Sequence, residues 1–324
     1  MCVLILQKGR REQGKMSKKE FYYLSTDGET QIHAVEWKPE GEVKQVLQIC
    51  HGMVEYIERY HEFAEYMSKQ GYYVVGHDHL GHGKSVTSPE KLGFFHEQNG
   101  NQYVIGDMHQ LRVHTEEKYP NTPYFILGHS MGSFLLRQYL GMYGDGLAGA
   151  VIMGTGNQPD IILKAGKLLC KVIAGFKGWN YRSKLVNNLA FGSYNKKFRC
   201  ETNGSTWISK NPENAIRYGQ DPLCQYMFTV NAYYHMFCGI EKANTYERRK
   251  ALSKELPIFF VAGEDDPVGN YGKDVSYLAD KYRKAGMKEV QMKLYAGDRH
   301  EILNEADREM VYQDISAWME SIIL

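Results

Sequence analysis

Short apolar runs rich in β-branched and aromatic residues alternate with stretches of helical periodicity along most of this chain. The runs lie at residues 46–50, 72–75, 124–127, 150–153, 257–261 and 290–294. Strands that alternate with helices of about 10–15 residues predict a mostly parallel sheet, because each helix carries the chain back to the edge where the next strand begins. Residues 21–25 and 31–37 instead indicate an antiparallel hairpin at the sheet edge. The sequence therefore predicts an α/β fold with helices on both faces of the sheet.

The alternation stops between residues 155 and 249. Apolar residues in this stretch occur at helical spacings, and aromatic and methionine side chains are frequent, among them Trp179, Trp207, Tyr226 and Phe237. We interpret residues 155–249 as a helical cap, or lid, inserted into a core made of residues 21–154 and 250–324. Most of its aromatic side chains are expected to form the core of the cap itself.

Residues 1–20 are expected to be a poorly ordered leader. The apolar run at residues 2–6 is too short for a secretory signal, and Lys8, Arg10 and Arg11 follow it directly. The six cysteines are scattered without any C-x-x-C pair, which favours reduced core residues over a disulfide framework. No apolar run approaches the 18 or so residues of a membrane span. These features predict a cytoplasmic protein.

The charge balance also restricts the partners of the chain. Lysine and arginine number 39 and aspartate and glutamate 38, so the formal net charge is +1. A protein that binds nucleic acid chiefly through its phosphates needs a basic excess, which is absent here. Nucleic acid is therefore not an expected partner.

The strongest local signal is the segment Gly128-His129-Ser130-Met131-Gly132. A G-x-S-x-G match is weak alone, but here a buried strand enters it and a helix leaves it. Such an elbow forces the serine into a strained conformation with its hydroxyl exposed, and the helix N-terminus favours developing negative charge. We predict that Ser130 is a nucleophile.

A serine nucleophile needs a histidine to remove its proton, and the histidine needs a carboxylate to fix its tautomer. In this architecture the chain order is serine, acid, histidine, with the last two after late strands. Asp266 follows the strand at 257–261, and His300 follows the strand at 290–294. Asp265 competes with Asp266 for the acid role; we favour Asp266 because the following Pro267 and Gly269 form a tight turn that would aim it.

Two backbone amides are expected to form an oxyanion hole. One belongs to Met131, which directly follows the nucleophile. The other belongs to Met53, in the loop after the strand at 46–50. The side chains of both methionines are incidental to that role.

With these residues in place, the chain from about residue 21 to its end resembles the α/β-hydrolases of the monoacylglycerol lipase and lysophospholipase group, which are filed beside the serine aminopeptidases. Residues 51–60 are similar to the group's H-G-x-x-E-x-x-x-R-Y block, with Tyr56 where many relatives carry histidine. Residues 78–85 are similar to its D-x-x-G-H-G-x-S block, and the elbow, residues 266–269 and residues 299–301 match its catalytic blocks. Residues 221–224 resemble its cap motif. The resemblance implies an α/β-hydrolase fold, a cap that shapes an acyl pocket, and no metal or organic cofactor.

Several alternatives have their own sequence signals. His77, His79 and His82 have the H-x-H-x-x-H spacing of metallo-hydrolases, but Gly81 stands where those enzymes place a ligating aspartate, so no metal is expected. An aminopeptidase would need cap carboxylates to bind a substrate ammonium. The candidates, most of them expected to be solvated, are Asp160, Glu201, Glu213 and Asp221.

The sequence thus predicts a serine carboxylester hydrolase that cleaves a lipid-like monoester, such as a monoacylglycerol or lysophospholipid, through an acyl-enzyme. A short-chain esterase, a thioesterase or a serine aminopeptidase could use the same triad. An inactive hydrolase fold that serves as a binding protein is disfavoured because all three triad residues are present. The expected partner is a small lipid-like ester, with no membrane span and at most transient contact with a membrane surface.

Overall fold

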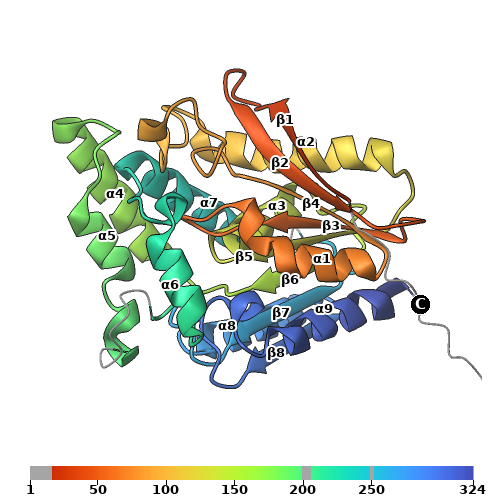
Figure 1. Cartoon of the computed structure of the whole chain (residues 1–324). Helices are drawn as coiled ribbons and strands as arrows, with labels where there is room; N and C mark the ends of the chain where they lie inside the picture. The colour runs from red at the N-terminus through yellow and green to blue at the C-terminus, as the bar shows by residue number, and fades with distance from the viewer. Residues whose placement is uncertain (1–16, 199–205, 249–251, 324) are drawn as a thin grey trace, which may run out of the picture.

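The computed structural model describes residues 17–198, 206–248 and 252–323 (Figure 1). The strands are β1 Ser17–Leu24, β2 Gln31–Lys38, β3 Gln45–Cys50, β4 Tyr72–His77, β5 Tyr124–His129, β6 Gly149–Met153, β7 Ile258–Gly263 and β8 Val290–Tyr295. The described α-helices are α1 His61–Lys69, α2 Gly100–Lys118, α3 Met131–Tyr143, α4 Asp160–Lys177, α5 Lys184–Phe191, α6 Pro212–Gln220, α7 Val230–Arg248, α8 Lys273–Lys284 and α9 Arg308–Ile323.

The strands form one sheet in the order β1-β2-β4-β3-β5-β6-β7-β8. Strands β3 to β8 pair in parallel, whereas β1 pairs antiparallel with β2 and β2 pairs antiparallel with β4. The predicted mostly parallel sheet and its edge hairpin are therefore confirmed. One boundary differs from the predictions: β1 begins at Ser17, inside the expected leader. Residues 1–16 of that leader lie outside the described residues.

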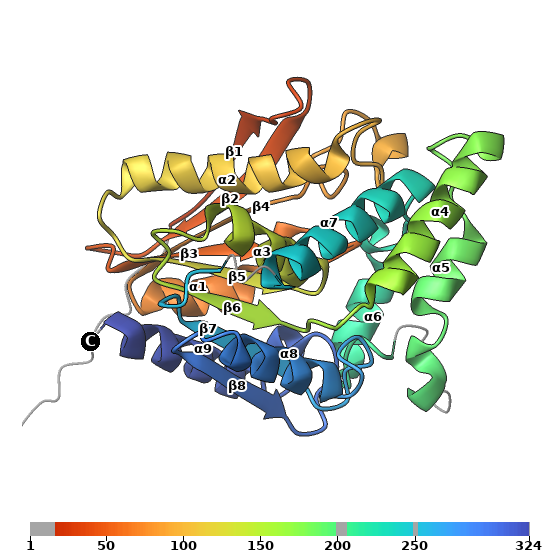
Figure 2. The same ribbon diagram turned by 180° about the vertical axis from the view of Figure 1, so that it is seen from behind.

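Alternate residues of the central strands face two separate cores. In β5, Ile126 packs into the core shared with α2, α3, α7 and α8, while Phe125 and Leu127 pack into the core shared with α1 and α9. Figure 1 shows α1 and α9 on one face of the sheet, and Figure 2 shows α3, α7 and α8 on the other. A parallel strand buried on both faces reads as a continuous apolar run, which explains why these strands were recognisable in the sequence.

The segment between β6 and β7 is helical wherever it is described, with α4 to α7 and no strand in residues 155–198 and 206–248. Helix α7 packs against α4 of this insertion and against α2 and α3 of the core. The insertion is therefore continuous with the helix layer on one face of the sheet. It begins directly after β6, so it lies at the carboxyl ends of the parallel strands, where α/β folds place their ligand sites.

The cysteines within the described ranges are all unpaired: Cys50, Cys170, Cys224 and Cys238, the first three of them buried. This agrees with the prediction of reduced core residues; Cys2 and Cys200 lie outside the described residues. No helix in the described ranges is both long and apolar enough to cross a bilayer.

Candidate active site

Ser130 occupies the turn between β5 and α3. Its φ and ψ are 53° and −119°, a sparsely populated conformation that costs a non-glycine residue about 1–3 kcal/mol. Two hydrogen bonds hold it there: its N–H donates to the Met153 carbonyl at 3.0 Å, and its carbonyl accepts from Ser133 Oγ at 2.6 Å. This geometry is the elbow that the sequence predicted.

The glycines of the elbow are required by backbone contacts. A Cβ added to Gly128 would lie 2.4 Å from the Gly132 carbonyl oxygen, and one added to Gly132 would lie 2.0 Å from the Cys50 carbonyl oxygen. Neither neighbour can move away cheaply, because both are backbone atoms of central elements. The spacing of the two glycines around Ser130 is therefore a steric consequence of packing α3 against β3.

His300 and Asp266 meet in the structure. His300 Nδ1 donates to Asp266 Oδ2 at 2.9 Å, and the other carboxylate oxygen of Asp266 accepts from the Val268 amide at 2.9 Å. Asp266 is completely buried, whereas Asp265 is partly exposed and pairs with Lys197. Of the two acids that the sequence left in competition, Asp266 is the one that contacts the histidine.

The His300 ring lies against two other rings. Its centroid is 5.0 Å from that of Trp207 in the insertion and 4.7 Å from that of His129, with interplanar angles of 37° and 40°. Together with the bond to Asp266, these contacts restrict the rotation of the imidazole. Trp207 was recognised in the sequence only as one of many aromatic residues of the insertion.

The loop after β3 approaches Ser130 closely. A Cβ added to Gly52 would lie 3.0 Å from Ser130 Cβ, so the segment that carries the Met53 amide runs beside Ser130. Met131 is the first residue of α3, and the first amides of a helix have no partner within it. Among the described residues, neither the Met53 amide nor the Met131 amide donates a hydrogen bond.

Two cavities meet at Ser130. The first, called the polar cavity because its lining is the more polar of the two, has a volume of about 320 Å³ and contains His300 and Trp207 together with polar residues such as Asn187 and Gln225. The second has a volume of about 460 Å³ and runs between α4, α5 and α7 along apolar side chains. Ser130 and Met53 line both cavities, so the hydroxyl lies where a polar and an apolar chamber join.

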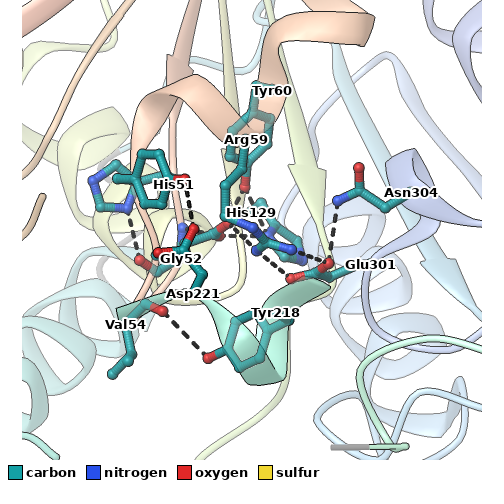
Figure 3. Close-up of polar contacts among 12 residues, drawn as sticks. His51, Gly52, Val54, Arg59, Tyr60, His129, Tyr218, Asp221, Glu301 and Asn304 are labelled. Carbon is teal, nitrogen blue, oxygen red and sulfur yellow. Dashed lines mark hydrogen bonds and ion pairs between the residues drawn. The ribbon is translucent and has the colours of Figure 1, made fainter. Parts of the chain in front are cut away.

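A buried network of charges lies beside the polar cavity (Figure 3). The Arg59 guanidinium donates to both oxygens of Glu301 at 2.6 and 2.7 Å and to Glu55 at 2.9 Å. Glu55 also accepts from the Gly52 amide and from the Tyr60 hydroxyl. Arg59 further lies over the Tyr218 ring of the insertion, 4.9 Å from its centroid.

His129 completes this network, and its surroundings favour its charged form. Its Nδ1 faces Glu55 at 3.1 Å and its Nε2 faces the His300 carbonyl at 3.2 Å, so both nitrogens meet acceptors. Burial lowers the pKa of His129, but the Glu55 carboxylate outweighs burial and the pKa is raised. Burial likewise opposes ionisation of Glu55 and Glu301, yet their cationic neighbours hold both pKa values below the ordinary range. Arg59 and a protonated His129 would together balance the two carboxylates in the interior.

This network joins the three segments that carry the site. Gly52 belongs to the loop after β3, His129 directly precedes Ser130, and Glu301 directly follows His300. The sequence alone identifies Glu55, Arg59 and Glu301 as parts of motifs and gives them no role. Their signal was that charged residues recur directly after strands whose ends meet at the same sheet edge.

Tyr56 stands where many relatives carry histidine, and its side chain contacts the insertion. Its hydroxyl donates to Asp221 Oδ2 at 2.6 Å, and Asp221 Oδ1 accepts from the Leu223 amide at 2.9 Å. The departure from the motif therefore links the loop after β3 to the insertion. The same contact binds Asp221, which is one of the carboxylates with which an aminopeptidase would hold a substrate ammonium.

The histidines that suggested a metal form a packed cluster with His51. The ring centroids of His51 and His79 are 4.2 Å apart, and those of His77 and His79 are 4.9 Å apart. Burial lowers the pKa of His77 and of His82 to about 3, and it also lowers the pKa of His51 and His79. Within the described ranges, no group of three or more His, Cys, Asp or Glu side chains is arranged to hold a metal ion.

Known proteins are similar to this chain over most of its length. The family model described as serine aminopeptidase, S33, matches residues 41–307. The monoacylglycerol lipase of Mycolicibacterium smegmatis is 24% identical over 88% of this chain and 91% of its own length. Human monoglyceride lipase is 25% identical over 87% of this chain and 84% of its own length.

Solved structures show the same fold. A thermostable carboxyl esterase from Bacillus coagulans, solved with glycerol, has a TM-score of 0.88 and 26% identity over 96% of this chain and 100% of its own. A soluble variant of the monoglyceride lipase of Saccharomyces cerevisiae has a TM-score of 0.72 and 18% identity over 98% of both chains. The predicted α/β-hydrolase fold is thus confirmed.

Gly132→Ala should abolish folding or destabilise the protein by more than about 4 kcal/mol, because its Cβ would overlap the Cys50 carbonyl. Gly175 in α4 is the matched control, since a Cβ there meets nothing within 4 Å. Gly175→Ala should stabilise the helix by up to about 1 kcal/mol. Urea unfolding followed by circular dichroism measures both changes, and a stable Gly132→Ala protein would contradict the packing argument.

Arg59→Met should destabilise the protein by about 3–5 kcal/mol, because Glu55 and Glu301 would remain buried without their shared cation. Arg283→Met removes an exposed arginine paired with Asp280 and should cost less than about 1 kcal/mol. Chemical unfolding of both variants provides the test. Equal losses for the two variants would show that the buried network does not stabilise the fold.

His82→Gln should make stability less sensitive to acid. The folded-state pKa of His82, about 3, lies below the value of about 6.5 for an unfolded histidine, so the unfolded chain binds more protons between these values. This difference lowers the free energy of unfolding as pH falls below about 6.5, by about 2 kcal/mol at pH 5 for one histidine. Urea unfolding at pH 7 and pH 5 should show a smaller decrease in His82→Gln, whereas exposed His114→Gln should keep the wild-type decrease.

Proposed function

The chain belongs to the serine aminopeptidase S33 family of α/β-hydrolases, and from that premise we propose that it is a serine carboxylester hydrolase that cleaves monoacylglycerol-like esters. The observation that carries this proposal is the meeting of an apolar and a polar cavity at Ser130. An ester with one long acyl chain and one small hydroxylated alcohol has the same two-part character. The carbonyl carbon would lie at the junction, beside the nucleophile.

The apolar cavity suits the acyl chain. Its volume of about 460 Å³ lies within the range of about 300–1,000 Å³ that small-molecule sites occupy. Its walls include Phe134, Leu163, Leu169, Met236 and Ile240, which offer no charged group near the chain. A short-chain esterase would leave most of this space unfilled, which favours medium or long acyl chains.

The polar cavity suits an uncharged alcohol. No lysine or arginine is among its described lining residues, and its carboxylates, Glu55 and Glu301, are already bound by Arg59. A phosphate would therefore find no cation that is free of a carboxylate partner among these residues, since His129 pairs with Glu55, and an ammonium would find no uncommitted carboxylate. Asn187 and Gln225 can exchange hydrogen bonds with the hydroxyl groups of glycerol. We therefore favour monoacylglycerol over lysophospholipid.

The proposed reaction proceeds in two halves. Ser130 Oγ attacks the ester carbonyl while His300 takes its proton, and Asp266 stabilises the resulting imidazolium. The Met53 and Met131 amides donate to the oxyanion. The carbon–oxygen bond to the alcohol then breaks, His300 protonates the leaving oxygen, and the acyl group stays on Ser130. Water, deprotonated by His300, repeats the attack and releases the fatty acid.

The serine aminopeptidase alternative is not favoured by the acids of the insertion. Asp160, Glu213 and Asp221 line neither cavity, and Glu201 lies outside the described residues. A thioesterase could use the same acyl cavity. It would differ from the proposed esterase only in the leaving group, which would be a thiol instead of an alcohol. We therefore keep ester hydrolysis as the proposal and test the leaving group directly.

The test compares kcat/KM across p-nitrophenyl esters from acetyl to palmitoyl, then across a monoacylglycerol, a lysophospholipid, an acyl thioester and an aminoacyl arylamide. We expect kcat/KM to rise with chain length, and monoacylglycerol to exceed the other three. Ser130→Ala should lower kcat by at least about 10³-fold. The variant should nevertheless unfold at the same urea concentration as the wild-type protein. A preference for acetyl or for the arylamide would overturn the proposal, as would near-normal turnover by Ser130→Ala.

A further inference from the structure

Val54, in the loop after β3, holds a backbone conformation that its side chain disfavours. Its φ is 57°, in the left-handed region, where a β-branched residue is an outlier. The penalty arises because Cβ comes too close to a backbone carbonyl oxygen, and glycine avoids it because it has no Cβ. Such a conformation persists only where the surrounding structure holds it in place. The contacts that hold Val54 are therefore informative.

Two hydrogen bonds fix the loop on either side of Met53. The Gly52 amide donates to Glu55 Oε1 at 2.5 Å, and the Val54 carbonyl accepts from the Tyr218 hydroxyl at 3.2 Å (Figure 3). Met53 lies between these two anchors in the chain, so together they set the direction of its N–H. Glu55 belongs to the loop itself, whereas Tyr218 belongs to helix α6 of the insertion.

The end of α6 that carries Tyr218 contacts the same stretch of chain at two further positions. The Tyr56 hydroxyl donates at 2.6 Å to Asp221, which directly follows the helix. The Arg59 guanidinium lies over the Tyr218 ring, 4.9 Å from its centroid. The hydrogen bond to Val54 is therefore part of a wider contact between α6 and the loop after β3.

The beginning of α6 is fixed to the segment that carries His300. Asn214 Nδ2 donates to Glu301 Oε2 at 2.8 Å, and the amide of Asn211, which caps the helix, donates to Glu305 at 3.0 Å. Helix α6 thus connects the segment of the histidine with the loop that carries the Met53 amide. A contact made by this helix can position one of these groups relative to the other.

We propose that Tyr218 is a positioning residue of the active site, whose hydroxyl holds Val54 in the left-handed conformation and thereby aims the Met53 amide at the oxyanion. This inference rests on the proposed function, because that amide matters for catalysis only if Ser130 attacks a carbonyl. A misplacement of about 1 Å in a group that acts on the transition state can lower a rate about 100-fold. One helix of the insertion would therefore contribute to catalysis as well as to substrate binding.

Tyr218 also lines the polar cavity, so its hydroxyl could instead bind the leaving alcohol. The two roles differ in the substrates that they affect. An oxyanion forms on every ester, whereas a hydrogen bond to the alcohol requires a hydroxyl on the leaving group. Phenyl butyrate separates the roles, because its leaving group carries no polar atom beyond the ester oxygen.

The first experiment measures hydrolysis of phenyl butyrate by Tyr218→Phe, which removes the hydroxyl and keeps the ring beside Arg59. We expect kcat and kcat/KM to fall together by about 10- to 100-fold, because the lost interaction acts in the transition state. Tyr23→Phe is the matched control. It also removes a hydrogen bond from a tyrosine hydroxyl to a carbonyl, that of Asp107 at 3.0 Å, but neither residue lines a cavity at Ser130. Its kinetics should be those of the wild-type protein.

The second experiment removes the need for the hydrogen bond. In Val54→Gly the positive φ carries no penalty, so adding Tyr218→Phe to that variant should lower kcat less than about three-fold further. If Val54→Gly does not fold, Val54→Asn takes its place, because asparagine is enriched in the left-handed region. Circular dichroism confirms that each variant is folded under the assay conditions. An equal loss from Tyr218→Phe with valine and with the replacement at position 54 would overturn the proposal.

A third measurement needs no substrate. In protein labelled with [15N]methionine, the Met53 amide signal is identified by its absence from Met53→Leu, and it should shift in Tyr218→Phe but not in Tyr23→Phe. An unshifted signal would overturn the proposal, as would normal turnover of phenyl butyrate with a raised KM for monoacylglycerol. A wild-type protein that cleaves other esters but no monoacylglycerol would overturn the proposed substrate and leave the role of Tyr218 intact.

Discussion

The backbone contact between Gly132 and the carbonyl of Cys50 is the constraint on which the rest of the site depends. It brings the first turn of α3 against the end of β3 more closely than any side chain would allow. Because α3 starts there, Ser130 must turn sharply, and its strained conformation is held by the surrounding sheet. The same close approach leaves the loop carrying Met53 beside Ser130. One steric condition thus sets the elbow and both amides of the proposed oxyanion hole.

The buried charges turn this arrangement into a rigid unit. A lone carboxylate in the interior would be costly, but Arg59 and His129 compensate Glu55 and Glu301 within hydrogen-bonding distance. The network spans the loop after β3, the elbow and the segment after His300. Movement of any one of them would expose an unpaired charge. The polar cavity beside the network consequently has no uncommitted charge among its described residues, which is the physical basis for expecting a neutral alcohol there.

The apolar side chains of the insertion between β6 and β7 lie in two environments, the cavity at Ser130 and the protein surface. Its inward-facing residues line the cavity that reaches Ser130, while Leu168 and Phe176 are exposed on the same helix as several lysines. From the sequence alone, most of these aromatic and apolar residues are expected in the core of the cap itself. Their spacing could not separate inward from outward positions, because α4 is apolar on both faces. Only the packing of α4 against α7 fixes which side is left exposed.

The sequence by itself determined the order of strands and helices, the elbow around Ser130 and the candidates for acid and base. These features are local: a strand buried on both faces is a continuous apolar run, and a tight turn requires glycines at fixed spacing. Tertiary structure decided between Asp265 and Asp266, which are adjacent in the chain but face Lys197 and His300 respectively. Tertiary structure also decided the roles of Glu55, Arg59 and Glu301, because the buried charge of Arg59 and those of the two carboxylates stabilise one another. Contacts between residues up to 242 positions apart leave no periodicity in a sequence, and they become visible only when the strands that carry them lie side by side.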